Sequence, residues 1–132
     1  MNELAKQIHD NAVKHGFYDS KREIGTLLML CVSELSEALE ADRHNEYARV
    51  DIENLYEDEF KNNFQKYIET IDEEEFREDF ELYIKDRFED EIADAIIRLL
   101  DICGYLNINI DKHIQLKMKY NQMRENMHGK KY

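Results

Sequence analysis

The chain has 132 residues, no proline and only four glycines, and its net charge is −12. This length is typical of one domain with a real core, and the scarcity of helix breakers favours an all-α fold. The acidic charge argues against general binding to nucleic acids or anionic membranes, and no apolar run approaches the roughly 18 residues of a membrane span.

The cysteine pattern favours a reducing compartment. Cys31 and Cys103 lie far apart in apolar helical surroundings, and they do not form a Cys-x-x-Cys motif. We therefore expect two buried thiols and no disulfide. Because the sequence also shows no signal peptide, we expect a cytoplasmic protein that neither spans a membrane nor binds nucleic acids stably.

The first third of the chain predicts two helices. Residues 2–15 form an amphipathic pattern that ends at Gly16, which is a suitable residue for the position after a helix. Ser20 and Glu23 have the spacing of a capping box, which predicts that a second helix runs over about residues 21–43.

The second helix places a carboxylate among apolar side chains. At 100° per residue, Glu34 falls inside the apolar sector and Glu37 falls on its flank. An ionised carboxylate in such surroundings is unfavourable unless it is paired or binds a metal. The residues that define the sector are Ile24, Leu27, Leu28, Cys31, Leu35 and Ala38.

Residues 45–88 form an acidic and aromatic section with helical spacing. We expect two helices, with a break near residues 70–73 and Asp72 as the N-cap of the second. The aromatic rows favour a core or an oligomer interface over a cofactor site. They consist of Tyr56, Phe60, Phe64 and Tyr67, followed by Phe76, Phe80, Ile84 and Phe88.

The rest of the chain predicts a long helix and a final one. The helix that follows Asp72 is expected to continue through Cys103, with Gly104 as its stop. We expect Asp111 to cap a last helix that ends near Met127. Residues 112–132 hold six Lys or Arg residues and a single acidic one, so the C-terminal part is basic.

Two pairs of carboxylates stand three residues apart in the most apolar helices. Glu34 and Glu37 form the first pair, and Glu91 and Asp94 form the second. Residues with this spacing share one helix face, so two packed helices would bring four carboxylates together. All-oxygen ligands select Mg²⁺, Mn²⁺ or Ca²⁺ over Zn²⁺. The alternative is that Glu34 and Glu91 form salt bridges with Arg or Lys.

The last predicted helix carries a row of groups that suit an anion. Lys117, Asn121 and Arg124 share one helix face, and their cations and amide can bind phosphate oxygens. Together with a cation held by the acidic pairs, this row predicts a polyphosphate site. The alternative is that Lys117 and Arg124 pair with the acidic section.

These motifs resemble those of the MazG-like all-α nucleoside triphosphate pyrophosphohydrolases. The resemblance covers about residues 20–43 and 86–128, and it includes the Glu-x-x-Glu and Glu-x-x-Asp pairs and the basic row. The family usually has a shorter connection between the two acidic pairs. The resemblance therefore implies a single MazG-like domain over 1–132, a helical bundle in which 45–88 is a helical, acidic and aromatic insertion between the two acidic motif helices.

The resemblance also implies a reaction. A nucleoside triphosphate would be cut between its α- and β-phosphates, with Mg²⁺ as cofactor and Mn²⁺ as the alternative. Glu34 would polarise the attacking water, and all four acidic residues would hold the metal. The resemblance further implies a homodimer or homotetramer. The runner-up interpretation is a non-catalytic helical regulatory or interaction protein with the same fold. The residues expected to bind the substrate are Lys117, Asn121 and Arg124 for the phosphates and Phe17 and Tyr18 for the base.

Overall fold

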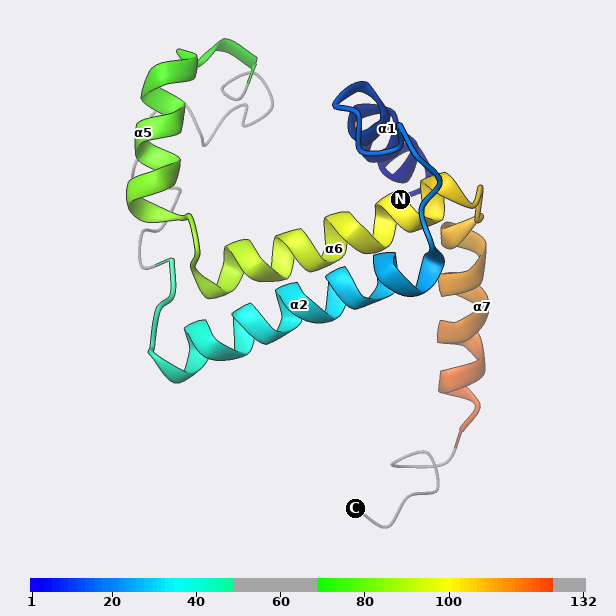
Figure 1. Cartoon of the computed structure of the whole chain (residues 1–132). Coiled ribbons are helices and arrows are strands. Elements are labelled where there is room, and N and C mark those ends of the chain that lie inside the picture. Colours follow the sequence, from blue (N-terminus) through cyan, green and yellow to red (C-terminus); the bar gives the residue numbers. More distant parts are fainter. Residues whose placement is uncertain (49–68, 125–132) are drawn as a thin grey trace. The chain divides into compact units, whose positions relative to one another are not determined.

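The computed structural model describes residues 1–48 and 69–124, and within these residues every regular element is a helix. The prediction of an all-α protein is therefore confirmed. None of the described helices is long and apolar enough to cross a membrane. The helices are α1 (Asn2–Lys14), α2 (Ile24–Arg43), α5 (Glu73–Tyr83), α6 (Phe88–Tyr105) and α7 (Ile110–Gln122) (Figure 1).

The chain divides into two compact units. We call residues 1–28 together with 96–132 the terminal unit, and residues 29–95 the central unit. Helices α2 and α6 each contribute one part to each unit. In the central unit, these two helices run side by side in opposite directions (Figure 1). A single domain over 1–132 stays a prediction.

Two predicted helix boundaries are confirmed. Gly16 follows the end of α1 with a φ of +78°, a left-handed conformation that glycine adopts at little cost. Asp72 caps α5, because its carboxylate accepts hydrogen bonds from the backbone N–H groups of Glu74 and Glu75.

Three other boundaries differ from the prediction. Helix α2 begins at Ile24, so the chain is not yet helical at Ser20 and the expected capping box does not form. The N-cap of α7 is Asn109, whose side chain accepts a hydrogen bond from the N–H of Lys112, and Asp111 lies inside the helix. Helix α7 ends at Gln122, and the predicted end near residue 127 lies outside the described residues.

The expected long helix is in fact two helices. The chain breaks between α5 and α6, where Asp86 has a φ of +59°. The break is held by the preceding chain: the N–H of Phe88 donates to the carbonyl of Glu46 at 3.0 Å, and the N–H of Ala48 donates to Oε2 of Glu89 at 2.7 Å. The stop at Gly104 is also wrong, since α6 continues to Tyr105.

The buried residues show which helix faces form the interior. In α2, the predicted sector is only partly buried, since Leu28 and Leu35 are about half exposed. The buried residues of α2 are Leu27, Cys31, Glu34, Ala38 and Ala41. In the terminal unit, Ala5, Leu100 and Cys103 form a core cluster with Ile8 and Ile110.

The predicted state of the cysteines is confirmed, because Cys31 and Cys103 are buried free thiols. Of the two predicted aromatic rows, the first, from Tyr56 to Tyr67, lies outside the described residues. The second is not fully buried: Phe76 is 41% exposed, and Phe80 is half-buried.

Candidate functional site

Helices α2 and α6 bring three carboxylates together in the central unit. Glu34 and Glu37 of α2 and Glu91 of α6 each place a side-chain oxygen within 4.8 Å of the other two. We call these three residues the acidic cluster. Glu34 and Glu91 are only 7% and 6% exposed, whereas Glu37 is exposed. The difference in burial follows the helical wheel, which put Glu34 among the apolar residues and Glu37 on their flank.

Small neighbours make room for the buried carboxylates. Glu34 lies on the buried face of α2, one turn from Cys31 and from Ala38, and Glu91 lies one turn before the buried Ala95. The exposed carboxylate is held by its own helix, because the hydroxyl of Ser33 donates to Oε1 of Glu37 at 3.2 Å. Local helical spacing therefore sets the burial of Glu34 and Glu91, and the packing of α2 against α6 brings the three carboxylates together.

The cluster is electrostatically strained. Burial and, after it, the nearby charges of Glu37 and Glu34 together raise the pKa of Glu91 to about 7. A salt bridge with Lys or Arg would lower this pKa. The raised value therefore argues against a salt bridge as the explanation for Glu91.

The fourth predicted ligand lies apart from the other three. Asp94 is exposed and is outside the group of oxygens within 4.8 Å, but its charge contributes to the raised pKa of Glu91. A second group was missed by the sequence analysis: Asp86, Asp90 and Glu91 also place ligand atoms within 4.8 Å of one another. The i, i+4 spacing of Asp86 and Asp90 was the only signal, and it is common in so acidic a chain. In the structure, Oδ2 of Asp90 accepts a hydrogen bond from the N–H of Asp86 at 3.0 Å.

The donor atoms of the acidic cluster fit a hard divalent cation. All of them are carboxylate oxygens, which suit Mg²⁺ or Mn²⁺ better than Zn²⁺. Bringing a cation to the cluster would offset the repulsion among its negative charges. Glu34, Glu37 and Glu91 are therefore the residues that could hold the metal together, with Asp94 and Asp90 at the edge.

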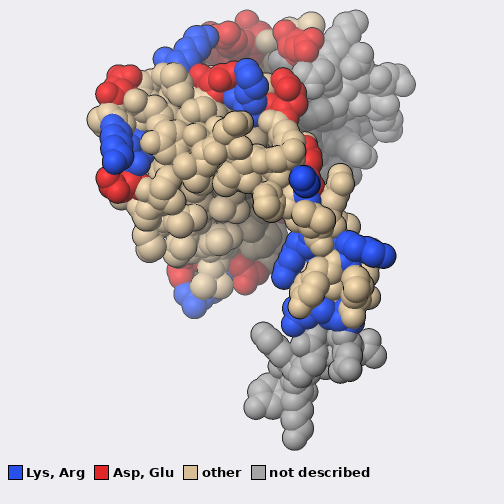
Figure 2. All heavy atoms as spheres, turned by 90° about the vertical axis from the view of Figure 1, so that its right-hand side faces the viewer, with Lys and Arg blue, Asp and Glu red and all other residues tan. Residues whose placement is uncertain are grey.

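The predicted phosphate-binding row belongs to the other unit. Lys117 and Asn121 lie in the last part of α7, in the terminal unit, whereas Arg124 follows the end of the helix at Gln122 and is not on its face. Figure 2 shows basic side chains gathered over this helix. The Nζ of Lys117 and the Cζ of Arg124 lie 5.2 and 5.8 Å from the ring centre of Tyr120. Within the described residues, the buried Oδ1 of Asn121 accepts no hydrogen bond.

The predicted base-binding pair is part of an aromatic cluster in the terminal unit. The hydroxyl of Tyr18 donates to Oδ2 of the buried Asp101 at 2.7 Å, and Nδ1 of His9 lies 2.8 Å from the other oxygen of that carboxylate. Burial, followed by the hydrogen bond to Asp101, raises the pKa of Tyr18. Phe17 lies edge-on to Tyr18, and the guanidinium of Arg22 lies 4.5 Å from the centre of the Phe17 ring.

This aromatic cluster was not foreseen as a unit. Neither His9 nor Asp101 was among the residues that the sequence pattern singled out. The two lie 92 residues apart in sequence, so no local pattern links them.

No protein-family model, no curated protein and no solved structure matches this chain.

Proposed function

We propose that this protein is a metal-dependent nucleoside triphosphate pyrophosphohydrolase of the MazG-like type, which cuts the bond between the α- and β-phosphates. The observation that supports this most directly is the acidic cluster, where two buried carboxylates and an exposed one converge from two helices. Bringing these like charges together is unfavourable, and a bound cation would offset their repulsion. A hard divalent cation is the ion whose ligand preference matches these oxygens.

Each acidic residue has a distinct role in this proposal. Glu34 polarises the attacking water, a role that the resemblance to the MazG-like enzymes implies. Glu37 and Glu91 would hold Mg²⁺ together with Glu34, with Asp94 as the fourth proposed ligand, and Glu91 would bind it as the carboxylate. When bound, the metal supplies charge neutralisation for the phosphate oxygens.

We propose a MazG-like helical bundle in which α2 and α6 carry the acidic pairs and residues 45–88 are an insertion. The row of Lys117, Asn121 and Arg124 is proposed to hold phosphates. The working form would be a homodimer or homotetramer in the cytoplasm.

The test is a panel of NTPs and dNTPs with Mg²⁺ or with a chelator. Pyrophosphate, nucleoside monophosphate and free phosphate are quantified separately. We expect Mg²⁺-dependent release of pyrophosphate and monophosphate in equal amounts. No Mg²⁺-dependent turnover of any nucleotide would favour the non-catalytic interaction protein, and release of free phosphate alone would show that the bond assignment is wrong.

Variants of the exposed ligands connect this activity with the acidic cluster. We expect Glu37→Gln and Asp94→Asn each to reduce turnover at least ~100-fold while the protein stays folded, because each removes one charge from the metal site. Glu40→Gln is the matched control. Glu40 lies on the exposed surface of α2, where it pairs with Arg43, so its substitution should leave turnover nearly unchanged.

A further inference from the structure

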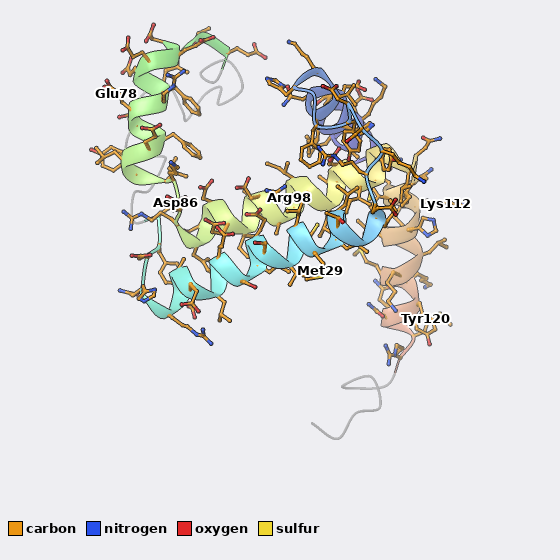
Figure 3. The ribbon with its side chains drawn as sticks, in the orientation of Figure 1. Met29, Glu78, Asp86, Arg98, Lys112 and Tyr120 are labelled. Atoms are coloured by element: carbon orange, nitrogen blue, oxygen red, sulfur yellow. The ribbon has the colours of Figure 1, made fainter. Side chains whose placement is uncertain are left out.

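A cleft of about 630 Å³ lies in the central unit, and Asp90 and Asp94 of α6 are among the residues that line it. Its size is in the range of small-molecule sites. One wall is a face of α5, and the other is the start of α6, where Figure 3 labels Asp86. The lining residues that matter here are Phe76, Arg77, Phe80, Lys85, Asp90 and Asp94. We call this the α5–α6 cleft.

The α5 wall presents an aromatic surface. Phe76 and Phe80 lie one turn apart with ring centres 5.9 Å from each other and ring planes tilted by 37°. Phe76 keeps 41% of its surface exposed, which is unfavourable for so large an apolar side chain. A planar ligand that stacks on the ring would cover this surface, and stacking of a base on an aromatic side chain is a common mode of recognition.

The α6 wall connects the cleft with the acidic residues. Asp90 and Asp94 line the cleft, and Asp90 also lies in the group of ligand atoms that includes Glu91. A nucleotide with its phosphates at these carboxylates, through a metal, could extend into the cleft. Arg77 and Lys85 supply the positive charges of the lining.

The aromatic pair predicted from sequence is less suited to this role. The hydroxyl of Tyr18 is bound by Asp101, and the ring of Phe17 is covered on one side by Arg22. Phe76, by contrast, is 41% exposed and lines a cleft.

We propose that the α5–α6 cleft binds the base of the nucleotide substrate, and that Phe76 is the residue on which the base stacks. This inference rests on the proposed function, since it assigns the base-binding part of the same site. It also gives the insertion a role: α5 is the part of the inserted segment that contacts the base.

The test uses tryptophan fluorescence, because the chain has no tryptophan of its own. The Phe76→Trp variant is titrated, in Mg²⁺, with α,β-methylene ATP, which cannot be cut at the α–β bond, and with inorganic tripolyphosphate. We expect saturable quenching by the nucleotide and none by tripolyphosphate. Leu82→Trp is the matched control, because Leu82 lies on α5, is 62% exposed and is outside the lining of the cleft. Its fluorescence should not respond.

Kinetics provide a second readout. We expect Phe76→Ala to raise the KM for nucleotides about tenfold with a smaller change in kcat, and Phe76→Tyr to restore the original KM. Equal quenching in both tryptophan variants, quenching by tripolyphosphate, or an unchanged KM for Phe76→Ala would overturn the inference. Quenching without any turnover would contradict the proposed function alone, and turnover with an unchanged KM for Phe76→Ala would contradict the cleft proposal alone.

Discussion

Glu34 and Glu91 bury two carboxylates next to each other, with an oxygen of each within 4.8 Å of the other. Two full charges about 4 Å apart repel by roughly 4 kcal/mol at an effective dielectric constant of 20. Burial and repulsion by the neighbouring acids together raise the pKa of Glu91 to about 7. The fold is therefore less stable when the cluster is fully ionised, and a bound cation would remove this disadvantage.

We expect the metal-free protein to lose stability as the pH rises through the range between the ordinary pKa of a glutamate, 4.5, and the folded value for Glu91, about 7. In this window the folded state holds a proton that the unfolded state has released, so raising the pH favours unfolding. The contribution of Glu91 is at most roughly 3 kcal/mol. Urea unfolding in EDTA between pH 5 and pH 8 measures it, and Mg²⁺ should restore stability at pH 8. Stability of the metal-free protein that rises with pH across this window would contradict this prediction.

Replacing Glu91 isolates its contribution to the pH dependence of the free energy of unfolding. We expect Glu91→Gln to be more stable than the wild type at pH 8 without metal, because the substitution removes a charge that is both buried and repelled. At pH 5, where Glu91 is already protonated, the two proteins should differ little. Glu78→Gln, which changes an exposed carboxylate of α5 (Figure 3), is the control and should leave the pH profile unchanged. A Glu91→Gln protein that is less stable than the wild type at pH 8 would argue against strain in the cluster.

Helical periodicity was enough to predict the burial of the acidic residues. The wheel placed Glu34 inward and Glu37 on the flank, and the structure has the same order of exposure. Periodicity does not show which of two apolar faces of α2 contacts the rest of the same chain. Leu28 and Leu35 were expected in the core but are exposed, because a wheel reports apolar faces and not what covers them.

The α5–α6 cleft could not be predicted, because it depends on contacts between distant residues. The break between the two helices is fixed by the bond from Phe88 to Glu46 and by the left-handed conformation of Asp86. No proline or glycine marks it in the sequence. A continuous helix would have carried Phe76 along the same axis as Asp90 and left no cleft between them.

The exposed apolar face of α2 leads to a prediction about assembly. Leu28, Val32, Leu35 and Leu39 follow one another at helical spacing, and each is about half exposed. A continuous apolar face of this kind is typical of an interface. We expect a homodimer or larger homo-oligomer in solution, and Val32→Lys combined with Leu35→Lys should convert it to a monomer. Light scattering after size-exclusion chromatography measures the mass.

The control for assembly is Leu82→Lys, which changes an apolar residue of α5 that is 62% exposed. It should leave the mass unchanged, because it lies off the α2 face. A wild-type protein that stays monomeric at about 100 μM, well above typical dissociation constants of stable dimers, would rule out the α2 face as a self-association surface.

Gly104 permits the close approach of α6 to α1 in the terminal unit. A Cβ atom at Gly104 would lie 2.6 Å from the carbonyl oxygen of Ala5 and 2.5 Å from the Cβ of His9. The contact with Ala5 is to backbone, so α1 would have to move. We expect Gly104→Ala to lower the free energy of unfolding by about 1–3 kcal/mol, even though alanine favours a helix by about 1 kcal/mol over glycine. Chemical denaturation followed by circular dichroism measures the change.

Gly25→Ala is the matched control for this contact. Gly25 lies in the first turn of α2, and a Cβ atom there would meet nothing within 4 Å. This variant should be as stable as the wild type or gain up to about 1 kcal/mol, because alanine restricts the unfolded chain more than glycine does. If Gly104→Ala were equally well tolerated, the close approach of α1 and α6 would not be required by the fold. A loss of stability confined to Gly104→Ala would attribute the effect to the contact with Ala5 and His9.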